Sequence, residues 1–232
     1  MPCPRYAIYY MPTSDDALYR FGAELLGYDA FTARTLDQPT DARTAFADWC
    51  ELTEEPRKYG FHATMKAPMA LADGVSESTL VESFEAFART PRAIPVITPV
   101  VRIIGSFIAV VPYTNNAALD KLAADCVQSF ETFRAKLTPA DRARRLQQSL
   151  TPRQIAHLDR WGYPYVFEDF RFHMTLSGSL HAARCEAVLA FLHERFSKLD
   201  RAAQPIDRLA LLKQQNQASR FTVLTHASLR SA

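Results

Sequence analysis

Residues 59–69, YGFHATMKAPM, and residues 170–180, FRFHMTLSGSL, share a short pattern in which a histidine is followed two positions later by a threonine. Side chains alternate between the two faces of a β-strand, so such a histidine and threonine point the same way. The intervening positions are apolar, as at Phe61, Ala63, Phe172 and Met174. Each stretch therefore predicts a strand with one face in a core and a polar face that carries an imidazole and a hydroxyl.

The two polar faces, set opposite each other, would line a cleft that we interpret as the active site. They supply six candidate residues: His62, Thr64, His173 and Thr175 as catalytic groups, and Lys66 and Arg171 as substrate-binding groups. Displacement at phosphorus needs a base, an acid and donors to the non-bridging oxygens. Histidine titrates near neutral pH, so one ring can be the base and the other the acid, while the threonine hydroxyls bind phosphate oxygens. This scheme needs no metal and no cofactor.

The rest of the chain reads as an imperfect duplication within one bilobal domain, residues 1–232, with halves at 1–105 and 106–232. Each half runs strand, helix, His-x-Thr strand, helix, return strand. We expect a first strand at 5–11, hairpins at 94–111 and 208–225, and helices at 14–26, 76–90, 116–137 and 182–199. Residues 28–58 predict a long surface connection with a short helix around 44–49.

An arginine-rich insertion distinguishes the second half. Thr138-Pro139 and Thr151-Pro152 are helix-start signatures that bracket Arg142, Arg144, Arg145 and Arg153. This cluster is either a solvated helix face or a contact for a phosphate-rich ligand such as an RNA end. Nearby Trp161, Tyr163 and Tyr165 either pack in the fold or stack on a base or sugar.

Composition narrows the class of protein. With 232 residues and a net charge of +2, the chain has no charge excess that indicates an extended nucleic-acid or membrane surface. Its four cysteines, Cys3, Cys50, Cys126 and Cys185, have no metal-ligand spacing and are expected to be free thiols. Neither a signal peptide nor a membrane-spanning run is recognisable, so we expect a cytoplasmic protein with no membrane partner.

The paired motifs His62-Ala63-Thr64-Met65 and His173-Met174-Thr175-Leu176 resemble those of the 2H phosphoesterase superfamily, which includes 2′,5′-RNA ligase-like proteins and cyclic phosphodiesterases. The stretches RYAIYYMP and KYGFHATMKAPM resemble a bacterial branch, DUF1045, associated with phosphonate-utilisation operons. The resemblance implies an α+β fold of two pseudo-symmetric lobes, each with an antiparallel sheet and flanking helices, and an active-site cleft between them. It also implies metal-independent hydrolysis, with both histidines as acid and base and both threonines on the phosphate; it offers no counterpart for Lys66 or Arg171.

The leading hypothesis is an enzyme that opens a cyclic phosphodiester on a nucleotide, an RNA end or a ribose cyclic phosphate from phosphonate breakdown. The alternative is a non-catalytic module that binds a nucleotide or RNA end with the same residues. A metallohydrolase is disfavoured because the chain has no H-x-H, HExxH or Cys/His cluster, and a serine hydrolase because it has no G-x-S-x-G. The pattern does not assign which histidine is the base, the oligomeric state, or whether residues 28–58 cover the site.

Overall fold

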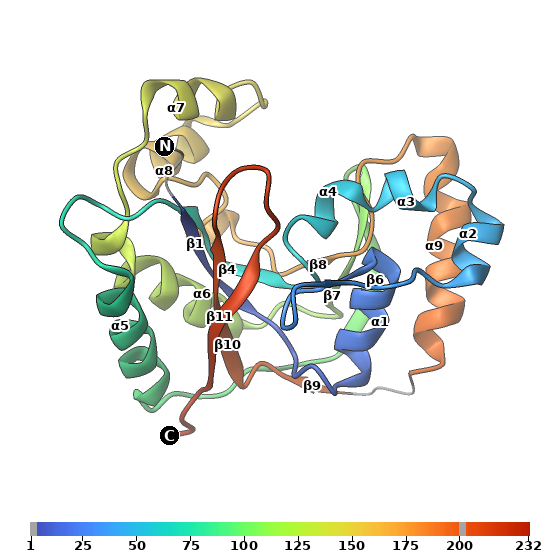
Figure 1. The fold of residues 1–232 in the computed structure, drawn as a ribbon, viewed down its shortest axis with the longest axis horizontal. Helices are drawn as coiled ribbons and strands as arrows, with labels where there is room; N and C mark the ends of the chain where they lie inside the picture. The colour runs from blue at the N-terminus through green and yellow to red at the C-terminus, as the bar shows by residue number, and fades with distance from the viewer. Residues whose placement is uncertain (1–3, 200–202) are drawn as a thin grey trace.

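Seven antiparallel strands form the central sheet of the protein, whose structure is a computed structural model that describes residues 4–199 and 203–232 (Figure 1). From edge to edge the order is β11-β10-β1-β4-β8-β7-β6. The strands are β1 (Arg5–Tyr10), β4 (Ala63–Met69), β6 (Pro99–Ile104), β7 (Phe107–Pro112), β8 (Met174–Thr175), β10 (Arg208–Gln214) and β11 (Thr222–Ser228). Two small ribbons pair β2 (Tyr28–Asp29) with β3 (Arg34–Thr35), and β5 (Val96–Ile97) with β9 (Gln204–Pro205).

Helices pack on the two halves of this sheet in pairs. α5 (Glu77–Arg89) and α6 (Ala117–Ser129) contact β10, β11 and β4, whereas α9 (Ala182–Ser197) contacts β6 and β7 and lies with α1 (Ala17–Leu26) at the right of Figure 1. Aromatic contacts join each pair: the ring centroids of Phe87 and Phe130 are 5.3 Å apart, and those of Phe21 and Phe196 are 5.6 Å apart. The predicted α+β fold with an antiparallel sheet and flanking helices is confirmed.

The return strand of each sequence half joins the other half of the sheet. β6, which ends the first sequence half, pairs with β7, and β10 from the second half pairs with β1. Within the described residues the two sheet halves are joined by the pairing of β4 with β8, in the middle of the sheet. Because the strands exchange in this way, the two His-x-Thr segments become neighbours although they are far apart in the sequence.

Local signals predicted several helix ends correctly and misplaced others. The first helix ends at Leu26, as predicted, and is followed by Gly27 in the left-handed region with φ of 74°, but it begins only at Ala17. Its N-cap is Asp16, whose carboxylate accepts a hydrogen bond from the Leu18 amide at 2.7 Å.

The connection from residue 28 to residue 58 has more regular structure than predicted. It contains β2 and β3 and three short helices, α2 (Thr40–Ala45), α3 (Trp49–Leu52) and α4 (Glu54–Arg57). The helix expected around 44–49 is wrong in position, since residues 46–48 separate two helices there. Trp49 is buried and its Nε1 donates to the Leu25 carbonyl at 2.9 Å, which ties the connection to α1.

The arginine-rich insertion forms an arm, residues 138–162, at the upper left of Figure 1. Its helices are α7 (Pro139–Arg145) and α8 (Pro152–Trp161), with Thr138 and Thr151 as N-caps and proline at the first helical position, as predicted. The Arg142 Nε donates to Asp159 at 2.6 Å and joins the two helices. Two 3₁₀ turns, η1 (Glu131–Phe133) and η2 (Phe167–Asp169), flank the arm.

In the described residues Cys50, Cys126 and Cys185 are free thiols, and the fourth predicted thiol, Cys3, lies outside them. None of the helices in that part of the chain has the length and apolar character needed to span a membrane.

Candidate active site

The two His-x-Thr motifs meet where β4 pairs with β8. Ala63 and Met174 are register partners, and both are fully buried. Continued by one residue in each direction, this antiparallel register sets His62 opposite Thr175 and Thr64 opposite His173. Directly opposed side chains have Cβ atoms roughly 4.5–5.5 Å apart, and diagonal neighbours stay within reach of long side chains. The four side chains lie on the face opposite Ala63 and are partly accessible to solvent.

Backbone carbonyls fix the orientation of both imidazoles in the same way. His62 Nδ1 lies 2.8 Å from the Gly60 carbonyl oxygen, and His173 Nδ1 lies 2.7 Å from that of Arg171. A carbonyl only accepts, so each Nδ1 carries the proton and each Nε2 is unprotonated, with a lone pair that can accept a hydrogen bond. The Thr64 hydroxyl donates to His62 Nε2 at 3.2 Å. Both rings are therefore held as bases.

Glycine is required before the first motif. Gly60 has φ of 76°, and a Cβ built there would come within 2.9 Å of the Ala30 Cβ. The left-handed conformation is costly for any residue with a Cβ, and it turns the Gly60 carbonyl towards the His62 ring. The local backbone thus sets the tautomer of the histidine.

The surroundings of the two histidines differ. Tyr9 on β1 is the register partner of Thr64, and its ring stacks on His62 with centroids 3.8 Å apart and planes at 25°. Ala109 on β7 is the register partner of Thr175, so an alanine stands beside the second motif where a tyrosine stands beside the first. Phe107 is the nearest aromatic ring to His173, at 5.6 Å between centroids. The surroundings of the two His-x-Thr motifs are therefore asymmetric.

The protein around each imidazole changes the proton affinity of both rings. Burial lowers the pKa of His62 to about 4, while the hydrogen bond to Gly60 raises it and the nearby charge of His173 lowers it. Burial likewise lowers the pKa of His173, against the raising effect of its bond to the Arg171 carbonyl. A proton on one ring thus disfavours a proton on the other, as in a coupled pair.

Lys66 does not face the histidines, contrary to the prediction. Tyr9 pairs with Thr64 but Ile8 pairs with Lys66, so Met65 is an extra residue and β4 has a bulge there. A bulge breaks the alternation of side chains, which puts Lys66 on the face of Ile8. The expected placement is therefore wrong, and no substrate contact follows for Lys66.

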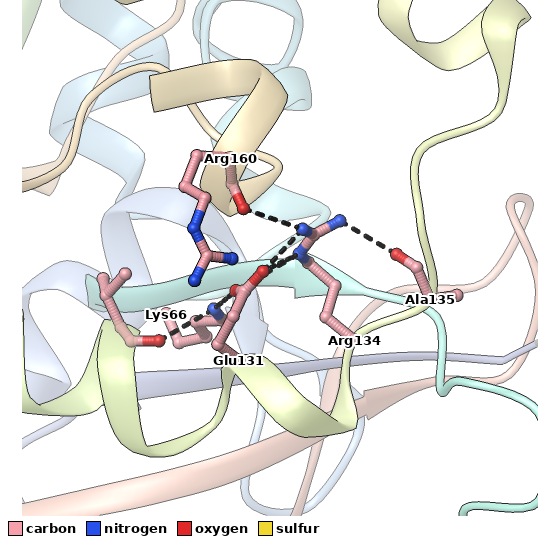
Figure 2. A network of polar contacts seen from close by, with 6 residues as sticks. Lys66, Glu131, Arg134, Ala135 and Arg160 are labelled. Atoms are coloured by element: carbon pink, nitrogen blue, oxygen red, sulfur yellow. Dashed lines mark hydrogen bonds and ion pairs between the residues drawn. The ribbon is translucent and has the colours of Figure 1, made fainter. Parts of the chain in front are cut away.

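Lys66 instead belongs to a buried polar network (Figure 2). It is 3% exposed, and its Nζ donates to Glu131 at 2.6 Å and to the Val127 carbonyl at 3.0 Å. Glu131 also accepts from Arg134 at 2.6 Å, and Arg134 donates to the Arg160 carbonyl of α8 at 3.2 Å. The network joins β4 to η1 and to the arm.

Arg171 contributes its carbonyl to the site, but its side chain is exposed and lines another hollow. This hollow, of about 860 Å³, is bordered by β6, the start of α6 and η2, and neither His62 nor His173 is part of its lining. Regular alternation does not reach Arg171, because β8 begins only at Met174. Its role in binding substrate stays a prediction.

Aromatic neighbours of His62 were missed by the sequence reasoning. The Tyr59 ring lies 6.0 Å from that of His62, and the Tyr9 ring stacks on it, although the motif pattern singles out neither tyrosine. The pairing of Tyr9 with Thr64 could have identified Tyr9, but no local signal sets that register. Among the described residues no three His, Cys, Asp or Glu side chains gather as candidate metal ligands.

Comparison with known proteins gives a family. The model described as "Protein of unknown function (DUF1045)" matches residues 64–222. A relative from Janthinobacterium sp. (strain Marseille), named ribose 1,5-bisphosphate phosphokinase PhnN, is 36% identical over 187 residues, which cover 79% of this chain and 41% of the relative. A protein of the same name from Laribacter hongkongensis (strain HLHK9) is 30% identical over 217 residues, covering 94% of this chain and 50% of that protein. The chain thus spans about half the length of these relatives.

Solved structures show weaker likeness. The E. coli LigT structure in complex with NADP⁺ has a TM-score of 0.45 and 10% identity, with 99% of both chains covered. A structure titled as a phosphoesterase has a TM-score of 0.38 and 12% identity, also with 99% of both chains covered. At these TM-scores neither likeness carries an argument about function.

Proposed function

We propose a function from one premise: the chain belongs to the DUF1045 family of proteins of unknown function. The function is hydrolysis of a cyclic phosphodiester by two-histidine acid–base catalysis. The observation that supports it is the pair of imidazoles at the β4–β8 junction, each with its Nδ1 hydrogen-bonded to a backbone carbonyl and its Nε2 therefore unprotonated. The resemblance of the two motifs to those of 2H phosphoesterases supports the same conclusion.

The reaction removes one proton from the attacking water and delivers one proton to the leaving oxygen. One Nε2 takes a proton from water as the water oxygen bonds to phosphorus, and the other imidazolium donates its proton to the ring oxygen as the P–O bond breaks. The product is a phosphomonoester next to a free hydroxyl. Thr64 and Thr175 donate to the non-bridging oxygens. Thr64 must therefore turn its hydroxyl from His62 Nε2 to the phosphate when substrate binds, which frees that lone pair.

Tyr9 separates the roles of the two histidines. Stacking by Tyr9 removes water from His62, so His62 stays neutral and suits the base. His173 has Ala109 in place of a tyrosine beside its motif and suits the acid, once the anionic phosphate raises its pKa. We therefore assign His62 as the base and His173 as the acid.

The substrate we propose is a ribose cyclic phosphate in phosphonate metabolism, and the support is the name of the two relatives, which act on ribose 1,5-bisphosphate. Their kinase activity is not proposed for this chain, because its 232 residues contain no G-x-x-x-x-G-K-[ST] phosphate loop. Cyclic nucleotides and cyclic RNA ends share the reacting group and are the competing substrates. The reaction is proposed without a metal.

A hydrolysis screen tests this function. Chelator-treated protein is incubated with ribose cyclic phosphates, 2′,3′-cyclic nucleotides and cyclic-ended RNA, and the phosphomonoester is measured by ³¹P NMR. We expect turnover of at least one class, and a loss of kcat of about 100-fold or more in His62→Ala and in His173→Ala with unchanged Tm. Binding without turnover, as in a non-catalytic module, would overturn the proposal, as would near-normal kcat in either folded variant.

A further inference from the structure

The carbonyl that orients His173 is not placed in the same way as the one that orients His62. Gly60 presents its carbonyl to His62 from a left-handed backbone with φ of 76°, whereas Arg171 does not have a positive φ. Residues 170–173 also lie outside β8, so regular strand pairing does not set the Arg171 carbonyl. The support of this carbonyl must therefore come from another part of the structure.

The turn η2, just before this segment, is bound by the first residues of α8. The Asp169 carboxylate accepts from Arg153 Nε at 2.8 Å and Nη2 at 3.1 Å, and from Gln154 Nε2 at 3.1 Å. The Gln154 side chain is also fixed at its Oε1, which accepts from the Thr151 amide in the capping box of α8. The hydrogen bond from Arg153 lowers the pKa of Asp169, which keeps the carboxylate ionised near neutral pH. Donors from one helix end thus fix the Asp169 side chain.

The backbone of η2 is strained and depends on the same helix. Phe167, at the start of η2, has φ of 53°, a left-handed conformation that is unfavourable for a residue with a side chain. Such a conformation persists only where the surrounding structure enforces it. The Phe167 ring packs edge-on against His157 and Trp161 of α8, with centroids 5.7 Å and 5.1 Å away. α8 therefore supports both the Asp169 side chain and the turn that carries it.

The Arg171 carbonyl lies between two anchors. Asp169 is two residues before it, and Phe172, directly after it, is buried with its ring 5.8 Å from that of Tyr10. We propose that Asp169 is a positioning residue, which by binding α8 sets the Arg171 carbonyl and, through it, the tautomer and orientation of the His173 ring. The positioning itself does not depend on the proposed function, whereas its effect on turnover rests on it.

An NMR experiment tests the positioning without any turnover. The ¹⁵N shifts of the imidazoles give the tautomer of each neutral ring in the wild type, in Asp169→Asn and in the matched control Asp159→Asn, which breaks an Arg–Asp ion pair elsewhere on α8. In Asp169→Asn alone, His173 should change from the Nδ1-protonated form to a mixture of both tautomers, because its Nδ1 loses a fixed acceptor. His62 should stay Nδ1-protonated throughout and is the internal reference. An unchanged His173 in folded Asp169→Asn, or an equal change in Asp159→Asn, would overturn the proposal.

A second variant removes the same contact from the side of the helix. Arg153 is 58% exposed, so Arg153→Ala should fold even if Asp169→Asn does not. It removes the guanidinium donors to Asp169 and keeps the hydrogen bond from Gln154, so His173 should show the same change to a smaller extent. Arg142→Ala, which breaks an exposed ion pair in the same arm, is its control. An unchanged His173 in Arg153→Ala would show that α8 does not set the ring.

A kinetic experiment then links the positioning to the reaction. With a substrate that the hydrolysis screen identifies, Asp169→Asn should lower kcat about 10-fold or more and leave KM within about threefold, since a misplaced ring affects the reaction more than binding. Asp159→Asn should keep the wild-type kcat. Normal kcat in Asp169→Asn with an altered His173 ring would contradict the acid role of His173 rather than its positioning. If no substrate is turned over, the proposed function fails, while the NMR experiment still decides whether Asp169 positions the ring.

Discussion

Replacing Tyr9 by alanine, the residue found beside the second motif at Ala109, should raise the pKa of His62. The Tyr9 ring stacks on His62 at 3.8 Å and is itself fully buried, so its removal admits water to the imidazole. The pKa of His62 is then expected to move from about 4 towards the ordinary value of about 6.5. If His62 is the base, activity at acid pH must fall in step with that change.

The size of the effect follows from the two pKa values. At pH 5 a base with a pKa of about 4 is about 90% neutral, whereas one with a pKa of about 6.5 is about 3% neutral. The ratio of kcat/KM in Tyr9→Ala to that in the wild type should therefore fall by up to about 20-fold between pH 7 and pH 5. Because the ratio is taken at each pH, the titration of His173 largely cancels.

Two measurements accompany the rates. NMR titration of the His62 ring gives its pKa directly in both proteins, and circular dichroism checks folding, since truncating a buried aromatic side chain costs about 3–5 kcal/mol. Tyr9→Phe is the matched control, because it keeps the stacked ring and removes only a hydroxyl that has no partner in the described residues. A pH-independent ratio between pH 5 and 7 in folded Tyr9→Ala would refute the assignment of His62 as the base.

Three further outcomes are expected. Lys66→Met breaks the buried ion pair with Glu131, so it should lower the free energy of unfolding in urea by about 3 kcal/mol and leave kcat/KM unchanged. The control is Lys121→Met, which breaks the exposed ion pair with Asp125, and an equal loss of stability there would contradict the role of burial. Gly60→Ala should lower both kcat and stability, because it disturbs the carbonyl that holds the His62 ring. Gly74 also has a positive φ but has open space around it, so Gly74→Ala should lower stability alone. Equal kcat in the two variants would show that the Gly60 carbonyl does not position the imidazole. Because folding depresses the pKa of His62, its contribution to stability should be lost as pH drops from about 6.5 towards 4, at no more than about 1.4 kcal/mol per pH unit from this group. The measured slope should therefore flatten in His62→Gln, and an unchanged slope would place the acid sensitivity elsewhere.

Local chemistry made part of the fold predictable. Several correct predictions depend only on residues within a few positions of each other. They are the hairpin of β6 and β7, the helix starts at Thr138 and Thr151, and the end of the first helix at Leu26. The face shared by His62 and Thr64 depends only on strand alternation over two residues. These predictions hold because no distant partner is needed to enforce them.

Long-range pairing made the rest unpredictable. The sequence spacing from Thr64 to Lys66 is the same as that from His62 to Thr64, so strand alternation predicts that all three share a face. The bulge at Met65 changes this, and it can be recognised only from the pairing of β4 with β1. The helix expected to reach residue 137 ends at Ser129, and Glu131 beyond it pairs with the buried Lys66 amine. In each case the sequence offers a regular pattern that a partner distant in the chain interrupts.

The strands beside the two motifs differ, and this difference would let two similar motifs take the separate roles that we propose. Two equivalent histidines would share one proton affinity, and neither would be preferred as base or acid. The strands that carry the motifs are constrained by the Ala63–Met174 pair at the centre of the sheet, where both side chains are fully buried. On the neighbouring strands, Tyr9 pairs with Thr64 and Ala109 pairs with Thr175, so the two motifs have different neighbours. In the proposed mechanism, the residues on β1 and β7 therefore separate the roles of the histidines, while the β4–β8 pairing that holds both motifs is unchanged.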